Sequence, residues 1–177
     1  MKALSRDELN SLIVVAQQDG DEMALMVRVA FNHGLRVTEL LSLTRDNIVG
    51  NTLVVQRLKG SKMTSQPLLA DERAGLLKLA ATCPGVFFAM SRWTFNRRLK
   101  EWGAKAGIDA SRLHAHVLKH STGRLAYKAG MGIAELQTYL GHVSGSSTMV
   151  YTQASESEAS AAFAAAIGQS FAVAGGR

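Results

Sequence analysis

The spacing of apolar residues departs from the helical pattern in one region of this chain, and that departure limits the fold more than any other feature. In most segments the apolar residues recur every three or four positions, which is typical of amphipathic helices. Within two short runs, Thr52–Leu58 and Thr64–Leu69, they alternate instead, and Lys59–Lys62 joins the runs. Such alternation across a short turn predicts a β-hairpin. The pattern therefore predicts an α+β fold, mainly α with a small antiparallel β-sheet.

Capping residues and glycines set the bounds of the predicted helices. Ser5 and Glu8 have the spacing of a capping box ahead of a first helix, and Asp71 and Ser91 are expected to cap two others. Gly141 is expected to end a helix. The other predicted helical segments are Glu22–Asn32, a short helix from Thr38, His116–Ala129, Ile133–Leu140 and Ser155–Phe171.

Length and charge narrow the class of protein further. A chain of 177 residues, 47% of them hydrophobic, is long enough for one domain with a buried core. The net charge of +6 favours a polyanionic partner, because Lys and Arg that neutralise phosphates release counterions. Cys83 is the sole cysteine, so neither an intramolecular disulfide nor a cysteine-rich zinc site can form. No apolar run approaches the ~20 residues that span a bilayer, and a cytoplasmic protein without a membrane segment is expected.

The predicted helix that begins at Ser91 is strongly basic. It carries Arg92, Arg97 and Arg98 beside an apolar stripe. A basic amphipathic helix is either a solvated surface helix or one that lies against a DNA groove, and both interpretations stay open here. Lys62, at the hairpin turn, is a further candidate for contact with DNA.

Several separated segments carry side chains suited to phosphate chemistry, and each alone is common. They read GLRVTELLSL with Arg36, RLKGSK, HVLKHS with His116, YLGH with His142 and TMVYT with Tyr151. In this order the set resembles the catalytic domain of the tyrosine recombinase, or phage integrase, family. That family has an arginine in G-L-R-x-x-E-L, a hairpin lysine, H-x-L-R-H, L-G-H and a nucleophilic tyrosine. The resemblance covers nearly the whole chain and is closest to the small single-domain recombinases that invert fimbrial promoter segments.

The chemistry of a phosphodiester explains why such residues occur together. Under attack the phosphorus becomes five-coordinate and doubly charged, so catalysis needs cations and donors around its nonbridging oxygens. Arg36 offers a guanidinium fork for two oxygens, although it could instead form a surface salt bridge to Glu39. His142 would donate to a nonbridging oxygen, although it could instead serve a helix C-terminus.

The nucleophile and the leaving group need proton transfer. The resemblance makes Tyr151 the nucleophile and gives His116 the task of managing its proton, which suits a group that titrates near neutrality. A hairpin ammonium can protonate the departing 5′ oxygen. Lys59 best matches the family position, and Lys62 stays an alternative. The bond energy is held in the phosphotyrosine, so no metal or other cofactor is expected.

One position departs from the family pattern. Lys119 stands where H-x-L-R-H has its arginine, so a point donor on a flexible stem replaces a planar fork. Either the site has adapted to lysine or turnover is slower. Adaptation is favoured because the other motif positions are intact.

The resemblance also implies the organisation of the chain. Residues 1–177 are expected to form a single catalytic domain without the separate N-terminal DNA-clamping domain usual in the family, and a naturally minimal recombinase is favoured over a fragment. Residues 153–177 hold the last predicted helix, whose stripe of Phe163, Ile167 and Phe171 packs either in cis or on a neighbouring protomer. The implied partners are double-stranded DNA with specific sites, a homotetramer on that DNA, a monomer when free, and accessory DNA-bending proteins.

The function implied is site-specific DNA recombination through a 3′-phosphotyrosyl intermediate, as in integration, excision or inversion by a mobile element. Two alternatives remain from the sequence. One is a DNA-binding regulator with a catalytically weakened site, motivated by Lys119. The other is a relaxase similar to the type IB topoisomerases.

Overall fold

A computed structural model describes residues 3–58, 62–143 and 146–152 of the chain. The helices are α1 (Arg6–Gln17), α2 (Asp21–Asn32), α3 (Val37–Leu41), α4 (Ala70–Thr82), α5 (Arg92–Lys105), α6 (Ala115–Lys128), α7 (Ile133–Leu140) and α8 (Ser146–Met149). Two 3-10 turns, Arg45–Asn47 and Ala110–Arg112, and three short strands complete the described elements. The predicted fold class, mainly helical with a small antiparallel sheet, is confirmed.

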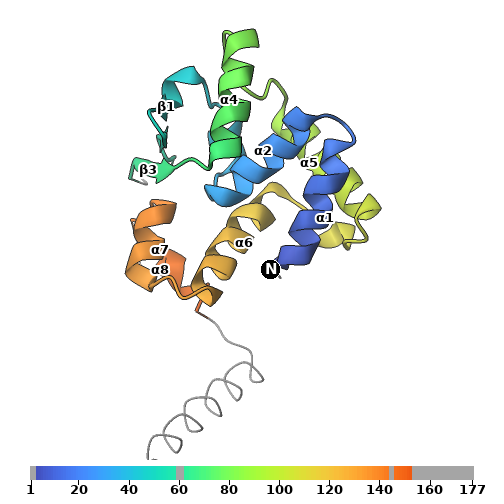
Figure 1. The fold of residues 1–177 in the computed structure, drawn as a ribbon. Coiled ribbons are helices and arrows are strands. Elements are labelled where there is room, and N and C mark those ends of the chain that lie inside the picture. The colour runs from blue at the N-terminus through green and yellow to red at the C-terminus, as the bar shows by residue number, and fades with distance from the viewer. Residues whose placement is uncertain (1–2, 59–61, 144–145, 153–177) are drawn as a thin grey trace, which may run out of the picture.

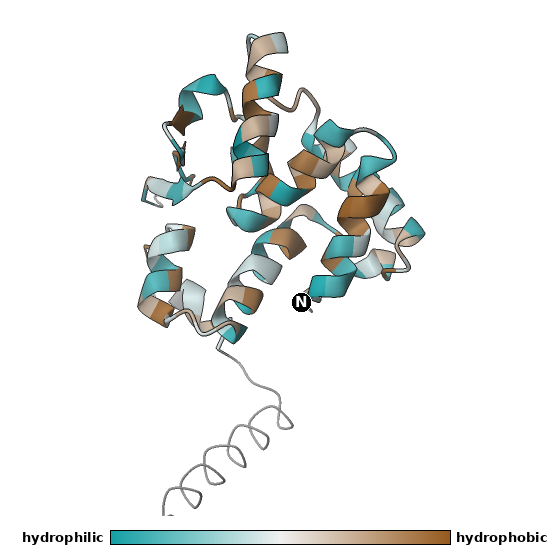
Figure 2. Ribbon diagram, in the orientation of Figure 1, coloured by the Kyte–Doolittle hydropathy of each residue, from teal (hydrophilic) through white to brown (hydrophobic). Residues whose placement is uncertain are grey.

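The core forms around α2, which lies at the centre of the molecule with α1, α4 and α6 packed against it (Figure 1). Apolar residues, brown in Figure 2, recur along α1 and α2, and α1 packs against both α2 and α5. Leu12, Met26 and Trp102 are fully buried there. The Trp102 ring N–H donates to Asp19 at 2.7 Å, so this large side chain is buried without losing its hydrogen bond.

The sheet is a three-stranded antiparallel meander of β1 (Ile48–Val49), β2 (Thr52–Val55) and β3 (Thr64–Pro67). Val55 pairs with Thr64 at the end of the ladder. The predicted hairpin is therefore present, with strands shorter than the sequence suggests and with β1 added to it. Strand β3 lies above α7 at the left of Figure 1 and packs against it.

At two helices the residue in the capping position differs from the sequence prediction. Asp71 was expected to cap α4, but the helix begins at Ala70, and the Leu69 N–H donates to Glu72 at 3.1 Å. Asp71 instead forms an ion pair with Arg28 on α2. The physical reason is tertiary: the buried Glu72 satisfies the free N–H of the helix start, which leaves Asp71 for a partner on a neighbouring helix.

The second difference is at α3, which begins at Val37 with Arg36 in the capping position, ahead of the predicted Thr38. The Arg36 N–H donates to the Glu39 side chain at 2.8 Å. The first helix matches its prediction, since Ser5 and Glu8 form a reciprocal capping box. The predicted helix Ser155–Phe171 lies outside the described residues.

A small apolar cluster beside the main core brings the end of the described chain onto α6 and α7. Leu136, Leu140 and Tyr151 are buried together, with Tyr127 and Met131 at their edge. This cluster fixes Tyr151 next to the turn that follows α7, which carries His142.

Candidate active site

Arg36 is held at the entrance of α3 by Glu39. Its backbone N–H donates to one carboxylate oxygen at 2.8 Å and its guanidinium to the other at 2.7 Å. The guanidinium also donates to the carbonyl oxygen of Leu58 at 3.3 Å, at the base of the hairpin tip. The Arg36 side chain is 22% exposed, whereas that of Glu39 is fully buried. Glu39 therefore orients the guanidinium while leaving part of it open to solvent.

The charge of Glu39 is stabilised by its donors. Burial alone would raise the pKa of this carboxyl, but hydrogen bonds from Arg36 and from the Leu58 N–H, together with the charge of Arg57, hold the pKa below its ordinary value. The Glu39 carboxylate is thus ionised at neutral pH. The alternative interpretation of Arg36 as a salt-bridge residue describes part of what it does, because the bridge to Glu39 exists.

The turn before Arg36 needs glycine. Gly34 has φ +54°, and a Cβ there would lie 2.5 Å from the Leu140 side chain. The close approach lets the Arg36 segment lie directly on the end of α7.

Lys119 lies on the buried face of α6, with 7% of its surface exposed. Its ammonium nitrogen is 3.5 Å from the carbonyl oxygen of Leu140. Burial, which is the largest cause, and the nearby guanidinium charges of Arg57 and Arg36 together lower the pKa of Lys119 to about 7, and Glu39 opposes them only in part. This lysine therefore titrates near neutrality and lies in the electric field of Arg36.

His142 follows the glycine that ends α7. Gly141 is left-handed, with φ +67°, and a Cβ there would meet the Lys62 carbonyl oxygen at 2.8 Å and the Arg57 side chain at 2.9 Å. The Lys62 N–H donates to the Gly141 carbonyl at 3.3 Å. The hairpin tip and the turn that carries His142 are thus in direct backbone contact.

The imidazole of His142 is half-buried and hydrogen-bonded. Its Nδ1 lies 3.0 Å from the hydroxyl of the buried Thr148. Burial, which is the largest cause, and the positive charges of Lys119, Arg36 and Arg57 together lower the pKa of His142 to about 4. The ring is therefore neutral at neutral pH and carries a single N–H proton.

Tyr151 is buried between two histidine rings. Its ring centroid lies 5.4 Å from that of His120 and 6.3 Å from that of His142, the latter pair nearly parallel at 17°. A Cβ on Gly123 would fall 2.5 Å from the Tyr151 ring, so the ring lies directly on α6 at a place where only glycine fits. Burial raises the pKa of the Tyr151 phenol, and the charge of Arg36 partly opposes this.

The described part of the chain thus brings four predicted residues into one site from four segments: Arg36, Lys119, His142 and Tyr151. The pKa of each of the last three is influenced by the charge of Arg36. Lys59 lies outside the described residues. Lys62 is exposed beside the site, and its backbone contacts Gly141.

His116 lies on the exposed side of the first turn of α6, where its ring centroid is 6.2 Å from that of His114. The nearer histidine to Tyr151 on this helix is His120. The sequence placed His120 inside the HVLKHS motif but gave it no task. Its position one turn after His116 put it on the same side of the helix, and that spacing was the available signal.

The three arginines of α5 have different surroundings. Arg92 is exposed, Arg97 pairs with Glu101 at 2.6 Å and lies 5.6 Å from the centre of the exposed Trp93 ring, and Arg98 pairs with Asp19 at 3.6 Å. Arg92 and Arg97 lie on the solvent side of the helix, whereas Arg98 reaches the segment between α1 and α2. Contact of all three with DNA stays a prediction.

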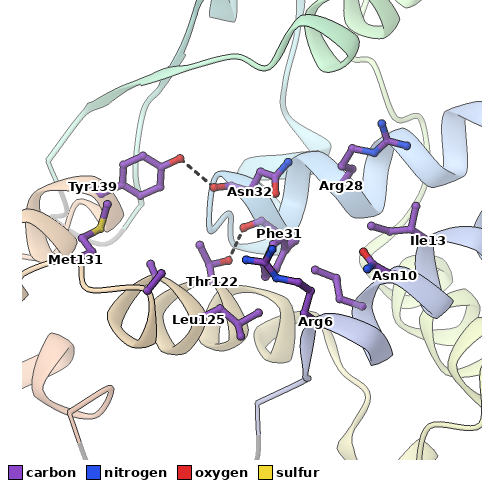
Figure 3. Close-up of a pocket in the computed structure, with 13 residues that line it drawn as sticks. Arg6, Asn10, Ile13, Arg28, Phe31, Asn32, Thr122, Leu125, Met131 and Tyr139 are labelled. Atoms are coloured by element: carbon purple, nitrogen blue, oxygen red, sulfur yellow. Dashed lines mark hydrogen bonds between the residues drawn. The ribbon is translucent and has the colours of Figure 1, made fainter.

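A groove of about 620 Å³ runs between α1, α2, α6 and α7 (Figure 3). Ile13, Phe31, Leu125 and Met131 give it an apolar lining, to which Arg6 and Arg28 add two charged side chains. Two hydrogen bonds fix its walls: the Tyr139 hydroxyl donates to the Asn32 carbonyl at 2.9 Å, and the Thr122 hydroxyl donates to the Phe31 carbonyl (Figure 3).

Within residues 3–58, 62–143 and 146–152, no helix is long and apolar enough to cross a membrane. In the same residues no group of three His, Cys, Asp or Glu side chains could hold a metal ion.

Fold and site together define a helical domain with clustered cations around a buried tyrosine, and comparison with known proteins identifies its class. Residues 2–158 match the Phage integrase family, so the chain belongs to that family. It is 33% identical over 166 residues to the tyrosine recombinase XerA of Pyrococcus furiosus, which covers 86% of this chain and 57% of the relative. It is also 33% identical over 147 residues to the tyrosine recombinase XerD of Haemophilus ducreyi, covering 72% of this chain and 48% of the relative.

Solved structures agree on the fold. The crystal structure of XerA recombinase superposes with a TM-score of 0.78 at 25% identity, covering 93% of this chain and 64% of that one. The catalytic domain of bacteriophage HP1 integrase gives a TM-score of 0.69 at 20% identity, covering 86% and 87%. The chain spans about half the length of the Xer relatives it matches. The predicted family is therefore confirmed, while particular closeness to the fimbrial recombinases stays a prediction.

Proposed function

We propose that this chain is the catalytic domain of a site-specific DNA recombinase, which cuts and rejoins strands through a 3′-phosphotyrosyl intermediate. The observation that carries the proposal is the placement of Tyr151 among residues from three other segments. Its ring stacks near His142, and the charge of Arg36 opposes the burial that keeps its phenol protonated. Family membership and the XerA and XerD relatives support the same activity.

The proposed reaction is a transesterification. The Tyr151 oxygen forms a bond to phosphorus while the bond from phosphorus to the 5′ oxygen breaks, and the second step reverses this with a 5′ hydroxyl as the attacking group. Arg36 binds nonbridging oxygens through its exposed side, and Lys119 supplies a further positive charge from the buried face of α6. Thr148 holds Nδ1 of His142, which directs the other ring nitrogen toward a phosphate oxygen.

Two protons move in this scheme. The departing 5′ oxygen takes one from a hairpin lysine, Lys59 by the family pattern, with Lys62 as the alternative. The Tyr151 proton leaves toward solvent, a task that the family pattern gives to His116, although His120 is the histidine of α6 that contacts the Tyr151 ring. Because the phosphotyrosine conserves the energy of the broken bond, the scheme uses neither metal nor nucleotide cofactor.

Double-stranded DNA is the proposed partner. Among the structural neighbours, XerH recombinase was solved bound to its difH substrate. Here the exposed Arg92 and Arg97, with Lys62 at the hairpin, supply the positive charge that a phosphate backbone requires. A DNA substrate makes the cytoplasm the proposed place of action, with accessory DNA-bending proteins as further partners.

We also propose a homotetramer on two DNA sites, formed from free monomers and joined through residues 153–177. Phe163, Ile167 and Phe171 recur every four residues, which gives the predicted helix one apolar stripe. The apolar groove between α1 and α6 is the proposed receiving surface on the neighbour (Figure 3). Phe163→Asp should abolish assembly on DNA in sedimentation while leaving cleavage by single protomers, and Gln169→Asp is the matched control.

The experiment that tests the activity uses a nicked suicide substrate, in which the strand released by cleavage diffuses away. DNA that flanks the coding region and contains inverted repeats is the first choice of target. A covalent adduct that is absent from Tyr151→Phe supports the proposal. DNA that is shifted but never covalently bound would support the regulator, and an adduct without exchange between two sites would support the relaxase.

A further inference from the structure

Arg57 is a fully buried charged side chain near the site, and the sequence assigned it no role. Its side chain is fully buried at the base of the hairpin tip, two residues before Lys59. Burial lowers the pKa of this guanidinium, but an arginine in a protein remains protonated. A full positive charge is therefore enclosed in the protein here, and such a charge is costly unless every donor has a partner.

The guanidinium of Arg57 has five N–H donors and meets five acceptors. Nε donates to the Thr64 hydroxyl at 2.9 Å. One terminal nitrogen donates to the Gly34 carbonyl and to the Glu39 carboxylate, both at 3.1 Å. The other donates to the carbonyls of His33 at 2.9 Å and Tyr139 at 3.4 Å. With its donors engaged by the protein, Arg57 is unsuited to bind a phosphate oxygen itself.

These acceptors belong to the segments that carry the reacting groups. His33 and Gly34 precede Arg36, and Thr64 begins the strand that leaves the hairpin tip. Tyr139 lies in the last turn of α7, just before the turn of His142. One planar group therefore joins the Arg36 segment, the hairpin and the His142 turn.

The contact to Glu39 extends this effect to Arg36. One carboxylate oxygen accepts from Arg57 at 3.1 Å and from the Arg36 N–H, while the other accepts from the Arg36 guanidinium at 2.7 Å. Fixing the carboxylate plane thus fixes the direction in which Arg36 points. A Cβ on Gly141 would lie 2.9 Å from the Arg57 side chain, so the glycine lets this turn pack closely against Arg57.

We propose that Arg57 is the positioning residue of this active site, aligning Arg36 through Glu39 and fixing the hairpin against the turn that carries His142. The inference rests on the proposed function, because alignment matters only if a phosphate is transferred here. Arg57 acts through other residues and does not touch the substrate. A displacement of about 1 Å at a reacting group can cost about a hundredfold in rate, so loss of the Arg57 hydrogen bonds should have a large effect on cleavage.

Arg57→Lys tests this role because it keeps the charge and the stem but offers three donors from one nitrogen, which cannot reach acceptors on three sides. We expect adduct formation on the suicide substrate to fall about a hundredfold or more. DNA affinity should stay within about threefold, because no phosphate contact is lost. Arg112→Lys is the matched control: Arg112 binds Glu8 and the Ala3 carbonyl away from the site, and its loss should leave cleavage unchanged.

A double-mutant cycle distinguishes positioning from general structural support. If Arg57 acts through Arg36, Arg57→Lys should add little further loss once Arg36→Lys is present. Arg112→Lys should show no such coupling. The charge of Arg57 lowers the pKa of Lys119. If cleavage needs charged Lys119, the cleavage rate falls as this lysine loses its proton at alkaline pH, and Arg57→Met should move that fall to higher pH. A purely structural role of Arg57 would not shift the pH profile.

The outcomes separate the two claims. Failure of the wild-type chain to form any adduct overturns the proposed function and this role with it. Wild-type cleavage by Arg57→Lys, an equal loss of DNA affinity, or additive losses in the cycle would overturn the role of Arg57 alone. If Arg57→Lys does not fold, Thr64→Val removes one acceptor, and cleavage equal to wild type by that variant overturns the role.

Discussion

Replacing Lys119 by arginine should change how cleavage depends on pH. In the free protein the pKa of Lys119 is about 7, because the ammonium is buried beside two guanidinium charges. The charged fraction is then about 0.9 at pH 6, about 0.5 at pH 7, about 0.1 at pH 8 and about 0.01 at pH 9. If the transition state requires the charge, cleavage by the wild-type chain falls about tenfold per pH unit above pH 8.

The arginine variant should lack this fall, because a guanidinium remains protonated throughout the range. We expect Lys119→Arg to keep cleavage at pH 7 and to exceed the wild type by about tenfold at pH 8. Other shifted groups do not interfere between pH 6 and 9. The pKa of His142 is about 4, and burial raises that of Tyr151 above its ordinary value of 10.

The assay is the initial rate of adduct formation with protein and DNA well below their Kd, because that condition reports the pKa values of the free protein. Lys119→Ala should lose cleavage at every pH. An equal alkaline fall in the wild type and the arginine variant would assign the titration to another group. A wild-type rate that stays level to pH 9, or cleavage by Lys119→Ala comparable to the wild type, would refute the assigned role of Lys119.

Three further predictions follow from the same contacts. Lys119→Met should raise the free energy of unfolding, measured in urea, by up to about 4 kcal/mol at pH 6. The pKa of Lys119 is lowered in the folded state, so its buried charge destabilises the fold most below pH 7, and the gain should vanish as the pH approaches 10. An unchanged gain at pH 10 would contradict this. Gly123→Ala should reduce adduct formation at least about tenfold while the chain stays folded, because the added Cβ meets the Tyr151 ring. The added Cβ of the control Gly85→Ala meets no atom, so this variant should cleave as the wild type does. Equal cleavage rates for Gly123→Ala and the wild type would contradict the packing of Tyr151 on Gly123. Arg92→Ala should weaken DNA binding at all sequences and lower the slope of log K against log salt by about one; an unchanged slope would place Arg92 away from the phosphates.

The fold could be predicted from local patterns because those patterns act over a few residues. The Ser5 capping box and the left-handed Gly141 stop occur where the sequence predicted them. Asp71 shows the limit of such reasoning. Its capping potential was outweighed by the buried Glu72, whose contact with the Leu69 N–H depends on packing between α4 and α2.

The site was predicted in part for a similar reason. The family motifs located Arg36, Lys119, His142 and Tyr151, but their electrostatics depend on burial, which the sequence does not contain. The alternation of buried Leu53 and Val55 in β2 would have turned Arg57 inward, and an inward arginine requires partners, so the signal was present. Its five acceptors could not be named, because they come from segments up to 82 residues away.

The role of Gly123 could not be predicted from the sequence. A glycine within a predicted helix reads as a modest loss of helix stability. In the fold it is the surface on which the Tyr151 ring rests, and only the three-dimensional approach of the chain end to α6 reveals this.

The identity of the nucleophile is the central claim, and peptide mapping of the covalent adduct tests it most directly. The wild-type chain is incubated with a nicked suicide substrate, digested with protease, and the DNA-linked peptide is sequenced by mass spectrometry. The account predicts a single phosphodeoxyribosyl peptide whose modified residue is Tyr151, and no adduct from Tyr151→Phe. An adduct on Tyr127 or Tyr139, or one that persists in Tyr151→Phe, would contradict it.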